Sequence, residues 1–239
     1  MINNQQISLI IPAYNEAKSI DIAIEVIRDY EKQHGKFAEI IVVNDGSTDD
    51  TLIRAQAHEG VQIIDKKQNQ GKGKAVQDGM LKSTSDWALF LDADLSIPIQ
   101  ELLKFIPHTE AYDLVIASRN LPESKRDTKQ AFYRTAMGKS FAFLVQSMFK
   151  TPIRDTQCGF KLIKRAVINQ VFPKMSVWGW CFDVEMLILA ESFAFKVKEV
   201  PITIIDRTRA SKVRPIRTSL EMFKDLLRIR RKFKRKEYN

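Results

Sequence analysis

Cysteine is scarce in this chain of 239 residues, which contains only Cys158 and Cys181. Two cysteines fit neither a disulfide framework nor a four-ligand zinc site, so we expect both to be reduced thiols that pack in the interior. No run of 18 or more apolar residues occurs, and the first residues lack a basic segment followed by an apolar stretch. The sequence therefore predicts no transmembrane helix and no secretory signal, and favours an intracellular protein that is soluble or peripherally bound to a membrane.

Two common nucleotide-binding motifs are also missing. The glycine-rich stretch 69–75, NQGKGKA, lacks the Gly-x-x-x-x-Gly-Lys-Ser/Thr of a Walker A loop, and no Gly-x-Gly-x-x-Gly follows a predicted strand. The stretch does place Lys72 and Gly73 just before a predicted helix, where backbone N–H groups and ammonium groups attract an anion. It therefore predicts an anion-binding loop of another kind.

Strand and helix patterns alternate along the first half of the chain. Apolar runs predict strands at residues 7–11, 39–43, 61–64 and 113–118, and another that ends at Asp92. Helical spacing predicts helices at about 19–34, 51–58, 75–82 and 98–105, with a loop starting at Pro12. This alternation is typical of an α/β fold with a parallel sheet and right-handed crossovers.

The strand ending at Asp92 is followed by a second carboxylate, Asp94. Ligands of α/β proteins bind at the carboxyl ends of the strands, so both acids are expected to reach a site. Paired carboxylates suit a hard cation such as Mg²⁺ or Mn²⁺, which often shares its ligands with substrate phosphates. The alternative is that these aspartates only stabilise a turn.

Positive charge is concentrated at the C-terminal end. Residues 207–239 hold 13 basic and 3 acidic residues, whereas the other 206 residues hold 25 and 26. Such a segment attracts nucleic acid, anionic lipid or a pyrophosphate, unless it is only a solvated tail. Because the body is nearly neutral and no base-stacking or zinc signature is present, a nucleic-acid-binding module is the weaker interpretation, and we expect no nucleic acid partner.

Segments 10–16 (IIPAYNE), 43–49 (VNDGSTD), 69–73 (NQGKG) and 92–94 (DAD) resemble, in order and spacing, the family 2 inverting glycosyltransferases of GT-A fold. Segments 155–161 (DTQCGFK), 180–185 (WCFDVE) and 199–201 (EVP), with Ser211 and Lys212, resemble the dolichyl-phosphate glucosyltransferase branch. Ala210 departs from that branch, where glycine is usual. The resemblance implies a nucleotide-diphospho-sugar transferase with a mostly parallel sheet flanked by helices. We expect a catalytic domain over residues 1–218 and a basic amphipathic helix or tail over residues 219–239.

The resemblance also implies roles for individual residues. Asp94 would bind the cation and Asp92 the ribose or the cation, with Ala93 between them. The nucleoside would contact Pro12, Tyr14, Glu16 and Asp45, and the anionic donor would approach Lys72 and Gly73. Arg119 and Arg134 would hold the acceptor phosphate, and Arg207 and Lys212 would close a loop over the diphosphate.

The implied reaction is inverting, metal-dependent transfer of a hexose, with glucose favoured, from a nucleoside-diphosphate sugar to a polyprenyl phosphate. UDP-glucose is favoured as the donor over GDP-mannose. A phosphate acceptor brings its own anionic oxygen and needs no strong base. The alternative is a sibling transferase that acts on a glycan or protein hydroxyl, with Asp155, Asp183 or Glu185 as its base.

Two segments are candidates for contact with a membrane. Residues 131–149 are rich in aromatic side chains but too short and too polar at their start to span a bilayer, so they form either an interfacial helix or part of the core. The C-terminal helix has an apolar face before a basic run. We expect peripheral attachment to the cytoplasmic face of a membrane, and release from anionic liposomes when this tail is deleted, with metal and nucleotide binding retained.

Overall fold

A computed structural model of the chain describes residues 2–127, 132–205, 215–235 and 237–238, and the side chains of these residues except 132–135 and 215–219. The strands are β1 (Ile7–Ala13), β2 (Glu39–Asn44), β3 (Val61–Asp65), β4 (Trp87–Leu91), β5 (Leu114–Ser118), β6 (Lys125–Arg126), β7 (Phe160–Lys164), β8 (Val197–Pro201) and β9 (Thr203–Ile204). The α-helices are α1 (Ile20–His34), α2 (Thr51–Gln56), α3 (Lys72–Lys82), α4 (Leu102–Phe105), α5 (Phe132–Phe149), α6 (Arg165–Val171), α7 (Phe182–Ser192) and α8 (Pro215–Lys234).

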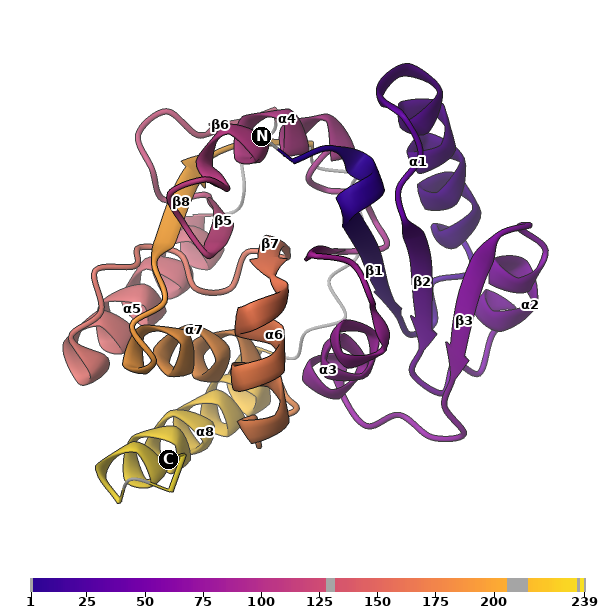
Figure 1. The fold of residues 1–239 in the computed structure, drawn as a ribbon. Coiled ribbons are helices and arrows are strands. Elements are labelled where there is room, and N and C mark those ends of the chain that lie inside the picture. The colour runs from indigo at the N-terminus through magenta and orange to yellow at the C-terminus, as the bar shows by residue number, and fades with distance from the viewer. Residues whose placement is uncertain (1, 128–131, 206–214, 236, 239) are drawn as a thin grey trace.

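The central sheet has seven strands in the order β3-β2-β1-β4-β7-β5-β8, and β6 pairs with β9 in a small separate sheet. Strands β1 to β4 are parallel to one another, and β5 is parallel to β8. Strand β7 lies between β4 and β5 and is antiparallel to both. The expected α/β fold with a mostly parallel sheet is confirmed (Figure 1).

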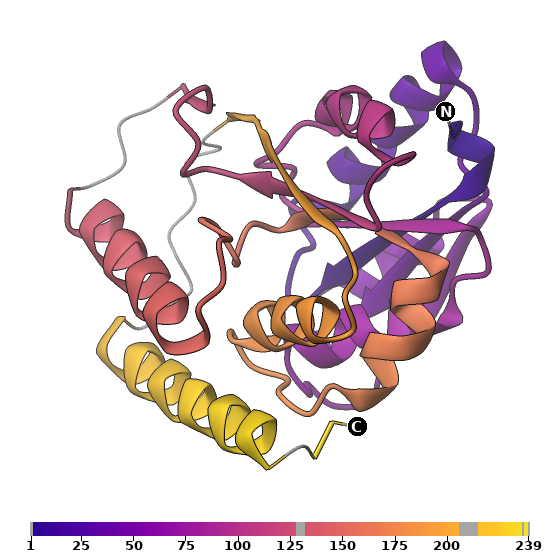
Figure 2. The ribbon, with the colours of Figure 1, turned by 60° about the vertical axis from the view of Figure 1, so that its left-hand side comes forward.

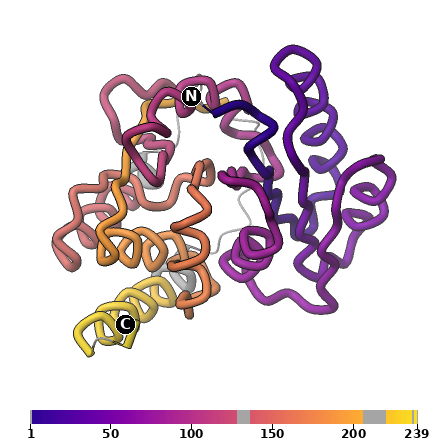
Figure 3. Tube along the Cα trace, in the orientation of Figure 1, coloured from indigo at the N-terminus to yellow at the C-terminus, as the bar shows by residue number. Residues whose placement is uncertain are grey.

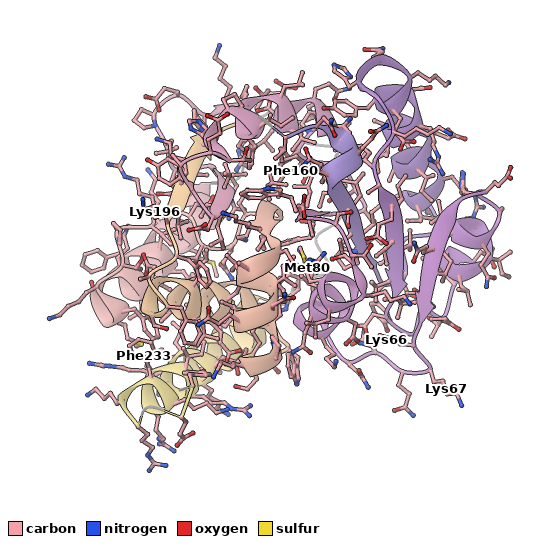
Figure 4. All side chains as sticks on the ribbon, viewed as in Figure 1. Lys66, Lys67, Met80, Phe160, Lys196 and Phe233 are labelled. Atoms are coloured by element: carbon pink, nitrogen blue, oxygen red, sulfur yellow. The ribbon has the colours of Figure 1, made fainter. Side chains whose placement is uncertain are left out.

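Helices cover both faces of this sheet because the buried strands are apolar on both sides. In β1, Leu9 packs in a cluster with α1 and α4, whereas the adjacent Ile10 packs in a cluster with α3, α6 and α7. The side chains of these layers fill the interior in Figure 4, where Phe160 of the first cluster and Met80 of the second are labelled.

Strand β1 continues through Pro12, where the sequence had indicated a loop. Proline has no N–H group and is tolerated in a sheet only where no ladder bond is needed from it. Pairing of β1 with β4 stops at Ile10, while pairing with β2 continues through Pro12 to Ala13. The strand therefore carries Pro12 and Ala13 beyond the end of β4, toward the edge where the loops gather.

Helix α3 begins at Lys72, three residues earlier than the expected start at residue 75. Gly71 precedes it with φ 99°, a backbone conformation that glycine adopts without strain. Gly73 lies inside the first turn, where an added Cβ would collide with the Phe182 side chain. The glycine-rich stretch is thus a tight helix entrance packed against the segment around α7.

A third cluster of buried residues joins α5, α7 and α8. Figure 2 shows α5 and α8 side by side, and the chain trace in Figure 3 places α8 next to α7, with the two chain ends well apart. Leu226 and Ile229 of α8 are fully buried, and the hydroxyl of Tyr238 donates a 2.6 Å hydrogen bond to Glu185 of α7. The expected boundary at residues 218/219 falls within α8, so the division into two parts stays a prediction.

Among the helices of the described residues, none combines the length and the apolar character that crossing a membrane requires.

Candidate active site

A cavity of about 540 Å³ lies at the carboxyl ends of β1, β2 and β4. This is the edge at which ligands of open α/β sheets bind. Eight of the predicted site residues line it: Pro12, Tyr14, Glu16, Asp45, Lys72, Asp92, Ala93 and Asp94. The other lining residues are Ala13, Asn69, Gly71, Ala75, Gly179 and Trp180.

Asp45 closes one side of the cavity and is almost fully buried. Its carboxylate accepts the backbone N–H groups of Gln70 (3.1 Å) and Gly71 (2.9 Å), and it lies 2.8 Å from Nζ of Lys66. Asp45 therefore fixes the entrance of α3 as well as lining the cavity. Lys66 was not predicted, and its sequence context gives no signal for this role.

Lys72 and Asp92 form an ion pair across the cavity, with 2.5 Å between Nζ and Oδ1. Burial alone would lower the pKa of Lys72, but the carboxylates of Asp92, Asp183 and Asp94 outweigh it and raise this pKa. The ammonium group thus stays charged at neutral pH. It brings positive charge to the start of α3, where the helix dipole also favours an anion.

Asp94 follows on the same loop, where its Oδ1 accepts the backbone N–H of Ser96 at 2.9 Å. This bond holds the carboxylate at the cavity wall and leaves acceptor capacity, since an ionised carboxylate has about four lone-pair sites. Within the described part of the chain, no group of three or more His, Cys, Asp or Glu side chains forms a metal site. Mg²⁺ commonly uses only one or two carboxylates together with substrate phosphates and water, so Asp94 and Asp92 fit a cation that arrives with a diphosphate.

Gly159 packs directly against the carboxylate of Asp92. A Cβ added at this glycine would overlap the Asp92 carboxylate. The carbonyl of the preceding residue, Cys158, accepts a 2.7 Å hydrogen bond from the buried Nζ of Lys161, which also lies 2.5 Å from Asp183. Burial raises the pKa of Asp183 despite this pairing. The sequence segment DTQCGFK thus places Gly159 directly against Asp92 and the buried Lys161 against Asp183.

We predict that Gly159→Ala will displace Asp92 and slow the reaction at this site on the order of tenfold, because small shifts of positioning groups are costly in a preorganised site. The measurement is the initial reaction rate together with the affinity for the substrate that fills the cavity. Gly138→Ala is the matched control, since nothing lies within 4 Å of a Cβ added there. An unchanged rate in Gly159→Ala would show that Asp92 does not depend on this close packing.

Of the other predicted site residues, Arg119 and Gly73 do not line the cavity. Arg119 forms a bidentate ion pair with Asp155, at 2.7 Å from Nε and 2.8 Å from Nη2, and its backbone N–H also binds that carboxylate. Gly73 is packed inside α3, as described above. Arg134 lies in the first turn of α5, and its side chain is outside the described residues, as are Arg207 and Lys212.

The two cysteines are both free and buried, as their scarcity suggested. Burial raises the pKa of Cys158 to about 12, and it also raises the pKa of Cys181. Both thiols therefore stay protonated at neutral pH and are poor nucleophiles.

The sheet order and the position of the cavity place the chain in the GT-A fold class. Within that class the chain belongs to Glycosyl transferase family 2, whose family model matches residues 8–172.

Relatives of the chain match almost all of it. A dolichyl-phosphate beta-glucosyltransferase of Dictyostelium discoideum is 37% identical over 96% of this chain and 75% of its own length. Enzymes of the same name from Saccharomyces cerevisiae and Homo sapiens are 34% and 31% identical, over 94% and 96% of this chain and 74% and 76% of their own. Glucosyl-3-phosphoglycerate synthase of Mycobacterium tuberculosis, solved with Mn²⁺, UDP and glucosyl-3-phosphoglycerate, shares the fold with a TM-score of 0.69 at 20% identity, over 94% of this chain and 78% of that one.

Proposed function

We propose that the chain transfers glucose from UDP-glucose to a polyprenyl phosphate with inversion at the anomeric carbon. An oxygen of the acceptor phosphate attacks this carbon opposite the leaving group, the new carbon–oxygen bond forms, and the bond to the diphosphate breaks as UDP leaves with the electron pair. An α-linked donor then gives a β-linked glucosyl phosphate. Relatives named dolichyl-phosphate beta-glucosyltransferase, at 31% to 37% identity, support both glucose and the lipid phosphate.

Three carboxylates that could serve as a base are already ion-paired or hydrogen-bonded, and this observation supports a phosphate as the acceptor. Asp155 is paired with Arg119, and Asp183 is paired with Lys161. Glu185 is fully buried and accepts hydrogen bonds from the backbone and hydroxyl of Ser176, from the backbone of Val177 and from Tyr238. A hydroxyl acceptor needs a base to take its proton, whereas an ionised phosphate does not. The arrangement therefore favours the phosphate over the sibling reaction.

The hydrogen bonds of Asp45 favour uracil over guanine as the base of the donor. Among the described residues, Gln70 and Lys66 occupy Oδ1 and Gly71 occupies one position on Oδ2. About one lone-pair site of the carboxylate is then left. The imide N–H of uracil is a single donor, whereas the edge of guanine presents adjacent N–H donors that require both oxygens. UDP is therefore the better match to this carboxylate.

A divalent cation, Mg²⁺ or Mn²⁺, would be held by Asp94 with Asp92 beside it. When bound, such an ion offsets charge on the departing diphosphate as a Lewis acid. The ammonium of Lys72 and the N-terminus of α3 add positive charge at the same place. This chain's own groups thus prepare the cavity for a diphosphate before any cation binds.

The acceptor phosphate is assigned to Arg119 and Arg134, and closure over the diphosphate to Arg207 and Lys212. The Arg119 side chain keeps 40% exposure although it is paired with Asp155. Asp155 holds the guanidinium in one orientation through Nε and Nη2, so a phosphate would bind through the other N–H groups of this planar fork. The side chains of the other three residues lie outside the described residues, so the structure bears on Arg119 alone.

Membrane attachment is proposed through α5 and α8, at the cytoplasmic face, where anionic lipids attract basic helices. Val145 of α5 is buried against its neighbours, whereas Phe143 is 72% exposed. The apolar face of α8 is divided in the same way, with Leu226 and Ile229 buried and Leu220 and Phe223 exposed. Both helices therefore keep apolar side chains available after they have packed on the body.

The test is transfer of radiolabel from UDP-glucose, and in parallel from GDP-mannose, to undecaprenyl or dolichyl phosphate with Mn²⁺ or Mg²⁺. We expect label in the lipid fraction from UDP-glucose alone, abolished by a chelator and reduced about a hundredfold in Asp94→Asn, because the neutral amide is a weaker cation ligand. The absence of any labelled lipid from a protein that binds UDP-glucose would contradict the proposed acceptor. Transfer from GDP-mannose would contradict the proposed base and sugar.

A further inference from the structure

One aromatic side chain in the cavity is not used by the chemistry above. Trp180 lines the cavity and is 44% exposed. The nearby Trp178 is partly buried against the core, and its ring centroid lies 5.7 Å from Nζ of Lys74. A large apolar ring left exposed on the wall of a cavity is the kind of surface that ligands cover.

The backbone that carries Trp180 is held on both sides. The carbonyl of Trp178 accepts the backbone N–H of Gly73 at 2.9 Å, and the carbonyl of Trp180 accepts the side-chain N–H of Gln157 at 3.0 Å. The thiol of Cys181 contacts a carbonyl of α8 at 3.3 Å. The ring is thus presented from a segment tied to α3, to the loop before β7 and to α8, so little ordering is needed when a ligand binds.

The order of groups along the cavity indicates which part of the donor meets Trp180. Asp45 stands at the end of β2, and Asp92 and Asp94 follow β4, two strands further along the sheet. Trp180 is bonded to Gln157, which precedes β7 on the far side of β4. A nucleoside at Asp45 and a diphosphate at the acidic pair therefore direct the sugar toward Trp180.

We propose that Trp180 is the surface on which the hexose of the donor lies, an inference that rests on the proposed function. The face of an aromatic ring carries partial negative charge. The C–H bonds on one face of a hexose carry partial positive charge and present an apolar patch. Contact between the two would hold the anomeric carbon in place without using any hydrogen-bonding group of the cavity.

The test is calorimetric titration of the full chain with UDP-glucose and with UDP, each in the presence of Mn²⁺. We expect Trp180→Ala to weaken UDP-glucose binding about tenfold and to leave UDP binding unchanged, because UDP lacks the sugar. Trp180→Phe should keep most of the affinity, since it retains a flat ring. Leu103→Ala, which removes a side chain of similar exposure from α4, is the control.

Equal weakening of both ligands in Trp180→Ala would overturn the inference, because the ring would then serve the nucleotide or the fold. Unchanged binding of both ligands would overturn it as well. Failure of the unaltered chain to bind UDP-glucose would instead contradict the proposed function, so the two failures are distinguishable.

Discussion

Replacing Lys161 with methionine will destabilise the folded chain by about 3–5 kcal/mol, because it leaves the buried Asp183 carboxylate without its partner. Lys161 is fully buried, and its Nζ lies 2.5 Å from Asp183, 2.7 Å from the carbonyl of Cys158 and 5.0 Å from the ring centroid of Phe90. The Asp183 side chain is only 5% exposed, so the remaining charge would be poorly hydrated. The measurement is the free energy of unfolding in urea.

The double variant Lys161→Met with Asp183→Asn separates the buried charge from other effects of the substitution. Removing both charges should recover most of the lost stability, since a buried ion pair replaced as a unit is often nearly neutral. The Cys158 carbonyl would still lack its donor, so recovery should be incomplete. A single variant within about 1 kcal/mol of the unaltered chain would show that Asp183 is readily protonated or hydrated.

Much of the cavity lining could be predicted from the sequence because its residues follow strands directly. Asp45 and Asp92 stand just beyond β2 and β4, and parallel strands bring their carboxyl ends to one edge. The sequence spacing could not predict which lysine pairs with each of these aspartates. Lys66 approaches Asp45 from the end of β3, and Lys72 reaches Asp92 because α3 starts earlier than its pattern indicates.

The second half of the sheet was harder to predict, for a physical reason. Strand β7 carries Lys161 at a fully buried position, so its apolar run is broken by a charge that only tertiary pairing can satisfy. Its antiparallel insertion between β4 and β5 also departs from the strand-helix alternation of the first half. Trp180 was present in a segment that resembled the family, yet only the fold shows that it faces the cavity while Trp178 packs inward.

Deletion of the C-terminal tail is a poor test of membrane attachment, because part of α8 is buried. Deleting residues 219–239 would remove Leu226, Ile229 and Tyr238, which are buried against the body. The deletion would therefore expose part of the α5–α7–α8 cluster, and loss of function could follow from unfolding alone. Exposed charges at the end of α8 offer a cleaner change. Four basic residues line a shallow depression of about 370 Å³ beside Leu227: Arg230, Arg231 and Lys234 of α8 and Arg235, which follows it.

Replacing these four basic residues with glutamine will weaken binding to anionic vesicles by about a thousandfold, since each such charge near an anionic leaflet contributes about 1 kcal/mol. The measurement is co-sedimentation with phosphatidylserine vesicles at low and high salt, with donor binding measured on the same protein to show that the fold is intact. The matched control exchanges four exposed lysines elsewhere on the surface: Lys32, Lys36, Lys67 and Lys82.

Figure 4 shows Lys67 of the control set on the opposite side of the molecule from Phe233 of α8. The two variants remove equal charge. If net charge alone drew the chain to the vesicles, both variants would lose affinity equally, and the assignment of α8 as the attachment surface would be wrong. If only the α8 variant is released, the position of the charges beside exposed apolar side chains matters more than their number. That outcome would indicate that the face formed by α5 and α8 lies against the membrane. The lipid phosphate would then approach the cavity from this side.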